Sequence, residues 1–264
     1  MAERVEQAGV AKAGLSASSL LTLALLAGAF ISLGAAFSTV AVTDSTLSFG
    51  LTRVVAGVTF SLGLILVVIA GAELFTGNLL IVMAWASRRV TTIGLLRNWV
   101  LAYIGNLFGA MATAGVMYMA HAWTFGGGSV GATALKIAAA KAALPFGEAL
   151  LLGVLCNALV CLAVWLCFSA RSTTDKILSI LFPITAFVAM GFEHSIANMY
   201  FIPMGLLLKA EPSVVAASGL SPAQLAPLTV SGYAANLIPV TIGNMIGGGV
   251  MVAAVYWFVY LRKK

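Results

Sequence analysis

The sequence GFEHSIAN at residues 191–198 decides the fold, because it puts a glutamate and a histidine inside a long apolar region. The run ILSILFPITAFVAM precedes it and MYFIPMGLLL follows it. Ionisable side chains are rare inside membrane helices and usually mark a functional site. Glu193 and His194 therefore indicate an interrupted membrane helix with a candidate site at the interruption.

The composition of the whole chain also indicates a membrane protein. The chain has 264 residues, of which 61% are hydrophobic and 8% charged, and its mean hydropathy is +1.07. In a soluble domain, about a quarter of the residues are charged. One soluble core cannot bury so much apolar surface, so we expect a lipid bilayer around the chain. The net charge of +6 then reports membrane orientation and does not indicate nucleic acid.

Two further features argue against a cleaved leader and against a metal or redox site. The charge-free run at residues 13–43 is too long for the apolar part of a signal peptide, so it predicts a retained membrane helix. Cys156, Cys161 and Cys167 share one apolar segment that has no Cys-x-x-Cys pair and no nearby histidine. We interpret them as small apolar residues and expect no metal and no other cofactor.

The hydropathy pattern predicts six membrane spans, each of which needs about 20 apolar residues. They are residues 20–42, 54–85, 99–120, 149–168, 177–208 and 233–261. The second and fifth are too long for one straight crossing and have glycine and polar residues at their middle, so we expect both to be interrupted. The other four are expected to be ordinary helices. We divide the chain into a cytoplasmic N-terminal segment, 1–19, and a six-helix transmembrane channel domain, 20–264.

The positions of Lys and Arg predict the orientation. With the N-terminus inside, one side of the membrane receives Arg4, Lys12, Arg88, Arg89, Arg97, Arg171, Lys176, Arg262, Lys263 and Lys264. The other side receives Arg53, Lys136, Lys141 and Lys209. Because basic residues collect on the cytoplasmic side, both termini are expected in the cytoplasm.

Two motifs occur twice. GAELFTGN at 71–78 and GFEHSIAN at 191–198 share G-x-E-x-x-x-x-N, in spans two and five. NWVLAYIGNLFG at 98–109 and NLIPVTIGNMIG at 236–247 share N-x-x-x-x-x-I-G-N-x-x-G, in spans three and six. Spans one and four show no comparable match. Since three spans are an odd number, the second copy must run the opposite way through the membrane.

The repeat predicts an all-α membrane protein with an inverted 3+3 arrangement, with halves at about residues 20–120 and 149–261. Inverted repeats with interrupted helices at matching positions are typical of transport pathways between the halves. The alternative is chance similarity between glycine-rich apolar segments.

The two interruptions need internal hydrogen bonds, because lipid cannot satisfy free backbone groups. Asn78 and Asn198 are candidates to bond those groups. Glu73 and Glu193 occur in both copies, so we interpret them as supports that bond backbone or asparagine side chains. A half-helix that begins inside the membrane also favours an anion at its N-terminus.

His194 aligns with Leu74 in the other copy, so the repeat itself does not require a histidine. Burial disfavours a charged imidazole, and we expect the ring to be neutral until an anion approaches. A protonated ring can lend a proton to a weak-acid anion, which removes most of the cost of moving a bare charge through an apolar constriction. The alternative is that His194 only stabilises the break. His121, at the end of span three, is expected at the surface.

Apolar residues near the breaks are candidates for narrow points in a pore. Phe60 and Leu64 are four residues apart and share one helix face, and Phe187 precedes His194 by seven residues. Such side chains are equally typical of lipid contacts or of a helical core.

The sequence resembles the formate–nitrite transporter family, and within it the formate-channel branch. The segments that carry the resemblance extend over about residues 7–262 and are FSLGLILVVIAGAELFTGNLLIV, RNWVLAYIGN, NALVCLAVWLCFSARSTTDK, GFEHSIANMYFIPMG and NLIPVTIGNMIGGG. The resemblance implies an aquaporin-like protomer with interrupted helices two and five. It also implies a homopentamer in a bacterial cytoplasmic (inner) membrane, with one pore in each protomer.

The resemblance also implies roles for particular residues. Thr76 and His194 would face each other at mid-pore. The constrictions would be Phe60, Leu64, Leu74 and Phe187, and the supporting polar residues would be Lys141, Asn157 and Glu193. Lys141 belongs to the segment GGGSVGATALKIAAAKAALPFGEA, expected to be an outer loop in which its charge draws anions in. The chain departs from the branch at Gly77-Asn78 and in this loop, which lacks the branch's histidines.

The predicted function is a channel for small monovalent weak-acid anions, with formate first, and not an enzyme. Nitrite and hydrosulfide are alternatives within the same architecture. A neutral-solute channel is a different class, but neither break has an Asn-Pro-Ala sequence, and His194 would have no task in it. A membrane enzyme subunit would need cofactor ligands, which two histidines without paired cysteines do not supply. For the N-terminal segment, the resemblance suggests an amphipathic cytoplasmic helix that gates the pore.

Overall fold

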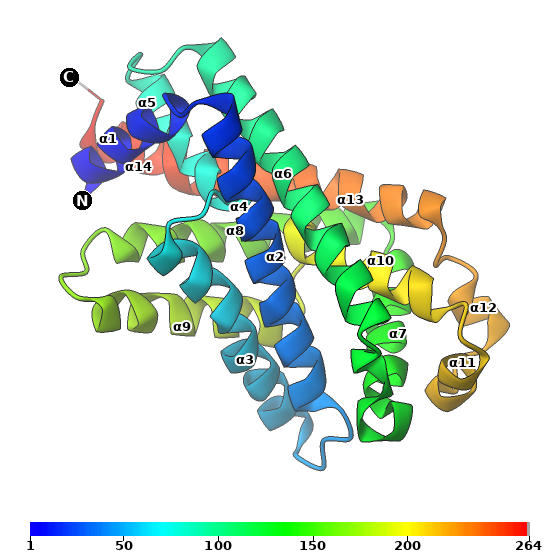
Figure 1. Cartoon of the computed structure of the whole chain (residues 1–264). Helices are drawn as coiled ribbons and strands as arrows, with labels where there is room; N and C mark the ends of the chain where they lie inside the picture. Colours follow the sequence, from blue (N-terminus) through cyan, green and yellow to red (C-terminus); the bar gives the residue numbers. More distant parts are fainter. Residues whose placement is uncertain (263–264) are drawn as a thin grey trace.

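The structure, a computed structural model, describes residues 1–262, and this part of the chain is helical with no strand (Figure 1). Within it, five helical runs are long and apolar enough to cross a membrane. They are α2 (Ala17–Val42), α3 (Phe49–Ala70), α6 (Thr92–Met119), α8 (Phe146–Cys167) and the run Val230–Tyr260. The count reaches six when α10 (Ser195–Leu208) and α11 (Pro212–Ser218), which meet at 111°, are taken as one bent span.

Both predicted interruptions are present. The residues of the predicted second span divide into α3, a break, α4 (Phe75–Asn78), η1 (Leu79–Ile81) and α5 (Val82–Ala86). Those of the predicted fifth span divide into α9 (Thr173–Ala189), a break and α10. Gly71 and Gly191 open the breaks with φ of 78° and 75°. Glycine adopts this left-handed conformation without a steric penalty, and so it ends the preceding helix at both positions.

Two predictions about the remaining segments are wrong. The expected outer loop contains η2 (Ala122–Gly128) and the helix α7 (Ser129–Ala142), because its alanine-rich sequence favours a helix and buries one face against α10. The sixth span is not an ordinary helix either. It runs from α13 (Val230–Met245) through a π-helical segment, η3 (Ile246–Ala254), into α14 (Val255–Tyr260). The wider turns coincide with three consecutive glycines at 247–249, which weaken a regular α-helix.

Two pairs of long helices cross at very short distance: α2 with α6, and α8 with α13. A Cβ atom added to Gly109 of α6 would lie 2.0 Å from the carbonyl oxygen of Leu25, and one added to Gly247 in η3 would lie 2.1 Å from that of Val154. Membrane helices approach closely where small residues meet, because packing and not hydrophobic burial holds them together. Both glycines end the repeated motif.

The helix α1 (Ala2–Ala13) lies at the end of the molecule that also carries α5 and α14 (Figure 1). The buried carboxylate of Glu6 pairs with the Arg89 guanidinium at 2.8 Å and ties α1 to the chain after α5. A short helix, α12 (Pro222–Leu225), lies at the other end. Lys263 and Lys264, which are counted among the basic residues that predict the orientation, lie outside the described residues.

Candidate functional site

Two cavities lie toward opposite ends of α3. The first, of about 300 Å³, is lined by Leu64 of α3 and by Lys12, and we call it the Lys12 cavity. The second, of about 420 Å³, is lined by Phe60 of α3 and by Lys141, and we call it the Lys141 cavity. The residues between the two cavities therefore form a barrier.

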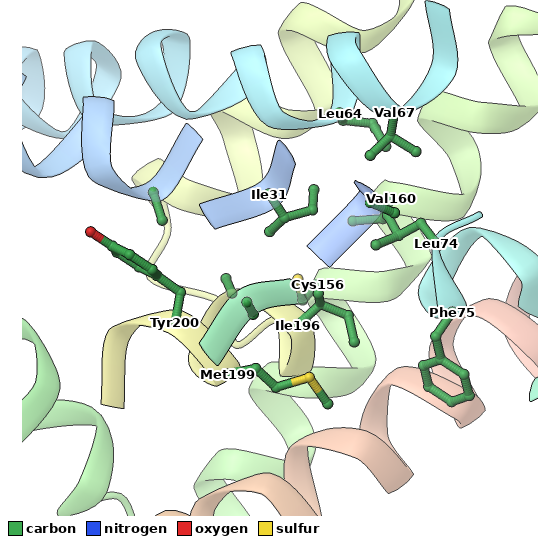
Figure 2. Close-up of a cluster of buried hydrophobic side chains, with 14 of the residues drawn as sticks. Ile31, Leu64, Val67, Leu74, Phe75, Cys156, Val160, Ile196, Met199 and Tyr200 are labelled. Carbon is green, nitrogen blue, oxygen red and sulfur yellow. The ribbon is translucent and has the colours of Figure 1, made fainter. Parts of the chain in front are cut away.

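Apolar side chains border the barrier on each side. The rings of Phe60 and Phe187 meet edge to face beside the Lys141 cavity, with their centroids 5.6 Å apart and an interplanar angle of 84°. Beside the Lys12 cavity, Leu64 and Leu74 belong to one buried cluster with Val67 and Val160, and Figure 2 shows these side chains in the same region. A bare ion in either cavity would therefore meet an apolar layer, which raises its free energy.

Thr76 and His194 meet where this barrier borders the Lys141 cavity, which His194 also lines. Thr76 Oγ1 lies 3.0 Å from His194 Nε2, and both side chains are buried. Thr76 lies in α4 directly after the first break, and His194 is the N-cap residue of α10 directly after the second. The two breaks thus bring one hydroxyl and one imidazole together from distant parts of the sequence.

The hydrogen bonds of His194 define its neutral tautomer. Nδ1 accepts the backbone N–H of Ala197 at 3.1 Å and so carries no proton in this arrangement. The proton of the neutral ring is then on Nε2, which donates to Thr76 Oγ1. The Thr76 hydroxyl keeps its own hydrogen for another acceptor. The imidazole also stacks on Phe187, with centroids 6.0 Å apart.

The first break is held by Asn106. Its Oδ1 accepts the backbone N–H of Phe75 at 2.9 Å, and its Nδ2 donates to the carbonyl oxygens of Ala24 at 2.7 Å and Glu73 at 3.0 Å. A buried backbone group without a partner costs about 1–3 kcal/mol, so the bonds to Phe75 and Glu73 offset part of the cost of interrupting the helix. The bond to Ala24 ties the break to α2.

Asn244 holds the second break in the same manner. Its Oδ1 accepts the N–H of Ser195 at 2.9 Å, and its Nδ2 donates to the carbonyl oxygens of Gly153 at 2.8 Å and Glu193 at 3.0 Å. Asn106 and Asn244 occupy the same position of the repeated motif, and they bond equivalent atoms.

The expected contacts between glutamate and asparagine are present at both breaks. Asn78 donates to Glu73 Oε2 at 2.8 Å, and Asn198 donates to Glu193 Oε2 at 2.6 Å. The expectation that these asparagines bond free backbone groups is wrong, because their amide groups donate instead to side-chain oxygens. The second acceptor is Oδ1 of Asn98 for Asn78, and Oδ1 of Asn236 for Asn198.

Each glutamate also forms an ion pair. Lys12 Nζ of α1 lies 2.5 Å from Glu73 Oε1, and Lys141 Nζ of α7 lies 2.7 Å from Glu193 Oε1. The backbone oxygens of the two lysines accept from Asn98 and Asn236, respectively. Lys141 is thus fixed on a helix beside the second break and does not lie in a loop.

Asn157 of α8 joins the barrier to α13. Its Nδ2 donates to the carbonyl oxygens of Thr76 at 3.2 Å and Asn244 at 2.9 Å. The thiol of Cys161, one turn further along α8, also donates to the Thr76 oxygen at 3.3 Å. All the side chains of this group are buried, which fixes the backbone that carries the Thr76 hydroxyl.

The structure adds Lys12, Asn98, Asn106, Asn236 and Asn244 to the residues proposed from the sequence. The four asparagines are positions that both copies of the repeated motif share, so the repeat itself is the sequence signal for them. Lys12 and Lys141 share only the tripeptide Ala-Lys-Ala, which is too short to identify as a repeat. His121 is exposed at the end of α6, as expected.

The helices and their two breaks define a multi-pass, all-helical membrane protein. Residues 1–258 match the family described as Formate/nitrite transporter. The formate channel FocA of Escherichia coli (strain K12) is 45% identical over 267 residues, which cover 100% of this chain and 94% of that protein. The probable formate transporter of Methanothermobacter thermautotrophicus is 40% identical over 92% of this chain and 89% of that protein. The chain belongs to the formate/nitrite transporter family.

Solved structures agree with this assignment. One described as a pentameric formate channel with formate bound is 44% identical, covers 93% of this chain and 98% of that one, and has a TM-score of 0.86. Another, described as an FNT family ion channel, is 28% identical with a TM-score of 0.81 and covers 98% of each chain.

Proposed function

We propose that the protein is a membrane channel for small monovalent weak-acid anions, and that formate is its preferred substrate. The observation that carries this proposal is the buried Thr76–His194 pair, which lies between two lysine-lined cavities and is bordered by apolar layers. The relatives named as formate channels support the choice of formate. Since the family consists of transporters, the protein transports solutes and is not an enzyme.

The transport step that we propose begins with electrostatic attraction. Lys12 and Lys141 each line one cavity, so an anion on either side of the membrane meets a positive charge before it reaches the barrier. Glu73 and Glu193 offset part of this charge at short distance, and so the attraction draws the anion in without holding it tightly.

At the barrier, the Thr76 hydroxyl donates its free hydrogen to the anion. The negative charge of the anion favours protonation of His194 by a proton from cavity water, and the imidazolium then gives one proton to the anion. The resulting neutral acid crosses the apolar layer at far lower cost than the anion. Protonation at Nδ1 removes its hydrogen bond from the N–H of Ala197, and so the imidazolium gives up a proton readily. After Nε2 has given its proton to the anion, the Nδ1 proton returns to cavity water and Nε2 takes a proton from water, which restores the starting tautomer and the bond to Ala197.

The other predicted site residues have supporting roles in this proposal. Phe60, Leu64, Leu74 and Phe187 form the apolar constrictions. Asn157 holds the backbone at Thr76, and the Lys141–Glu193 pair supports the second break beside His194.

We propose that the chain is an inverted repeat of three spans and three spans. The matching bonds of Asn106 and Asn244, and the matching ion pairs of Glu73 and Glu193, support this arrangement. They extend the repeat to α1 and α7, the helices that carry Lys12 and Lys141. The N-terminal segment, 1–19, then precedes a channel domain, 20–264, with halves at about 20–120 and 149–261.

We also propose a homopentamer in a bacterial inner membrane with both termini in the cytoplasm. The pentameric formate channel with TM-score 0.86 supports the assembly. The orientation rests on the uneven distribution of Lys and Arg in the sequence, with ten on the side of the membrane that carries Lys12 and four on the side that carries Lys141. Native mass spectrometry tests the assembly, with five copies as the expected stoichiometry.

Uptake into proteoliposomes tests the substrate class. The purified protein is assayed with formate, nitrite, hydrosulfide and glycerol at several pH values, with protein-free vesicles as the control. We expect formate uptake well above the control and no glycerol uptake. Faster uptake of nitrite or hydrosulfide than of formate would contradict the choice of formate as the preferred substrate. Uptake of glycerol alone would contradict the anion channel.

A further inference from the structure

Arg53 of α3 bridges the two helices that carry the aromatic constriction. Its Nε donates to the carbonyl oxygen of Ala189 at 2.9 Å, and its Nη2 donates to that of Val188 at 2.6 Å. Both acceptors belong to the last turns of α9. Arg53 also lines the Lys141 cavity and forms no ion pair with any residue in 1–262.

The end of α9 needs this donor. The last carbonyl groups of a helix have no partner within the helix, and a cation near them also interacts favourably with the helix dipole. At this end, Val188 accepts the N–H of Gly191 and Phe187 accepts that of Phe192. Within residues 1–262, Ala189 accepts a hydrogen bond from Arg53 alone. The Arg53 guanidinium therefore completes the hydrogen bonding of α9 where the second break begins.

The bridge lies on the helix face that carries Phe60. Arg53, Gly57 and Phe60 follow one another at spacings of four and three residues and so share one face of α3. At Gly57 the backbones of α3 and α9 nearly touch, since an added Cβ would lie 2.5 Å from the carbonyl oxygen of Thr185. On α9, Phe187 directly precedes Val188, which accepts from Arg53. The bridge thus joins the two walls of the aromatic constriction.

The first break has no equivalent bridge. Within residues 1–262, no side chain donates a hydrogen bond to the carbonyl oxygens of Val68, Ile69 or Ala70 at the end of α3. Lys176 of α9 lines the Lys12 cavity near this end, and its ammonium group has no hydrogen-bond partner in the described part of the chain. The Arg53 bridge is therefore particular to the constriction beside the Lys141 cavity.

We propose that Arg53 is a positioning residue that sets the width of the Phe60–Phe187 constriction and thereby the size of the anion that passes. This inference rests on the proposed function as an anion channel. A methionine at position 53 removes both bonds to α9 and the positive charge. A lysine keeps the charge, but it lacks the planar fork that reaches two carbonyl oxygens at once. Lys136 lines the same cavity and pairs with no acid in residues 1–262, so Lys136→Met removes a charge without touching α9.

The test compares acetate with formate, which differ by one methyl group. Uptake of both anions into proteoliposomes is measured for the wild type, Arg53→Met, Arg53→Lys and Lys136→Met. We expect the acetate-to-formate ratio to rise about tenfold in Arg53→Met, the scale of discrimination that one methyl group gives in a fitted pocket. Arg53→Lys should change the ratio in the same direction, and Lys136→Met should leave it at the wild-type value. An unchanged ratio in both Arg53 variants, or the same rise in Lys136→Met, would overturn the inference.

A second measurement is independent of transport. Hydrogen–deuterium exchange of the amides at residues 187–194 should be faster in both Arg53 variants than in the wild type, and unchanged in Lys136→Met. If Arg53→Met does not fold, Arg53→Lys carries both measurements. Unchanged exchange in Arg53→Lys would overturn the bridge even in a protein that transports formate. Absence of any anion uptake by the wild type, with faster exchange in the Arg53 variants, would instead contradict the proposed function and leave the bridge supported.

Discussion

The ring nitrogen Nε2 of His194 lies 3.0 Å from the hydroxyl oxygen of Thr76, so a hydrogen bond joins the half-helices that follow the two breaks. The same ring caps α10, because its Nδ1 accepts the backbone N–H of Ala197. One side chain therefore starts a helix and also supplies the titratable group of the barrier. These two roles respond differently to substitution, and stability and transport can be measured separately.

Replacement of His194 by asparagine or by alanine separates the cap from the proton chemistry. Asparagine is a good N-cap residue, whereas loss of the cap in His194→Ala costs about 1 kcal/mol. We expect a lower melting temperature in detergent for His194→Ala than for His194→Asn. Equal melting temperatures would show that the bond to Ala197 contributes nothing to stability.

The helix crossings predict a sharp difference between two glycines of α6. In Gly109→Ala the new methyl group meets the Leu25 carbonyl oxygen, since the Cβ would lie only 2.0 Å from it, so α2 and α6 must separate. Gly115 has no atom within 4 Å of an added Cβ, and Gly115→Ala should raise stability by up to about 1 kcal/mol, because alanine favours a helix more than glycine does. Thermal unfolding of both variants checks this. Similar losses in both would contradict the close contact at Gly109.

The two ion pairs should differ in how much stability the protein loses when one partner is removed. The side chains of Lys141 and Glu193 are 16% and 4% exposed, against 33% and 7% for Lys12 and Glu73. Removal of one partner of a buried pair leaves an uncompensated charge and costs about 3–5 kcal/mol. We therefore expect Lys141→Met to lower the melting temperature more than Lys12→Met. The double variant Lys141→Met with Glu193→Gln should recover part of the loss, and a further loss instead would contradict the pairing.

Asn106 and Asn244 should contribute equally to stability. Each side chain makes two buried hydrogen bonds to backbone groups at its break and one to a neighbouring helix, and each orphaned group costs about 1–3 kcal/mol. Asn106→Ala and Asn244→Ala are expected to lower the melting temperature strongly and to a similar extent. The control is Gln7→Ala, which changes an exposed residue of α1 and should have little effect. A large effect for only one asparagine would contradict their equivalence.

Much of this fold could be predicted from the sequence because the bilayer restricts the possibilities. The apolar runs and the glycines with polar neighbours identified both interrupted spans, and the repeated motifs contained Asn106 and Asn244. The helix α7 was missed because it is short and moderately apolar, and its stability comes from packing against α10.

Contacts between distant residues could not be predicted from spacing alone. Only the family resemblance predicted that Thr76 lies close to His194, and the structure adds the distance and the tautomer. The bond between Lys12 and Glu73 joins an N-terminal helix to a break far along the chain. The bridge from Arg53 to α9 likewise depends on how two helices cross, and no short sequence pattern predicts it.

The central claim is that His194 passes a proton to the anion, and formate uptake by His194→Asn tests it most directly. Wild-type protein and His194→Asn are reconstituted at equal amounts, and uptake is measured between about pH 5 and pH 8, the range in which imidazole ordinarily titrates. We predict that wild-type uptake varies with pH, and that His194→Asn, folded and of wild-type oligomeric state, shows strongly reduced uptake with no pH dependence. Uptake by His194→Asn that matches the wild type in rate and in pH dependence would contradict the account.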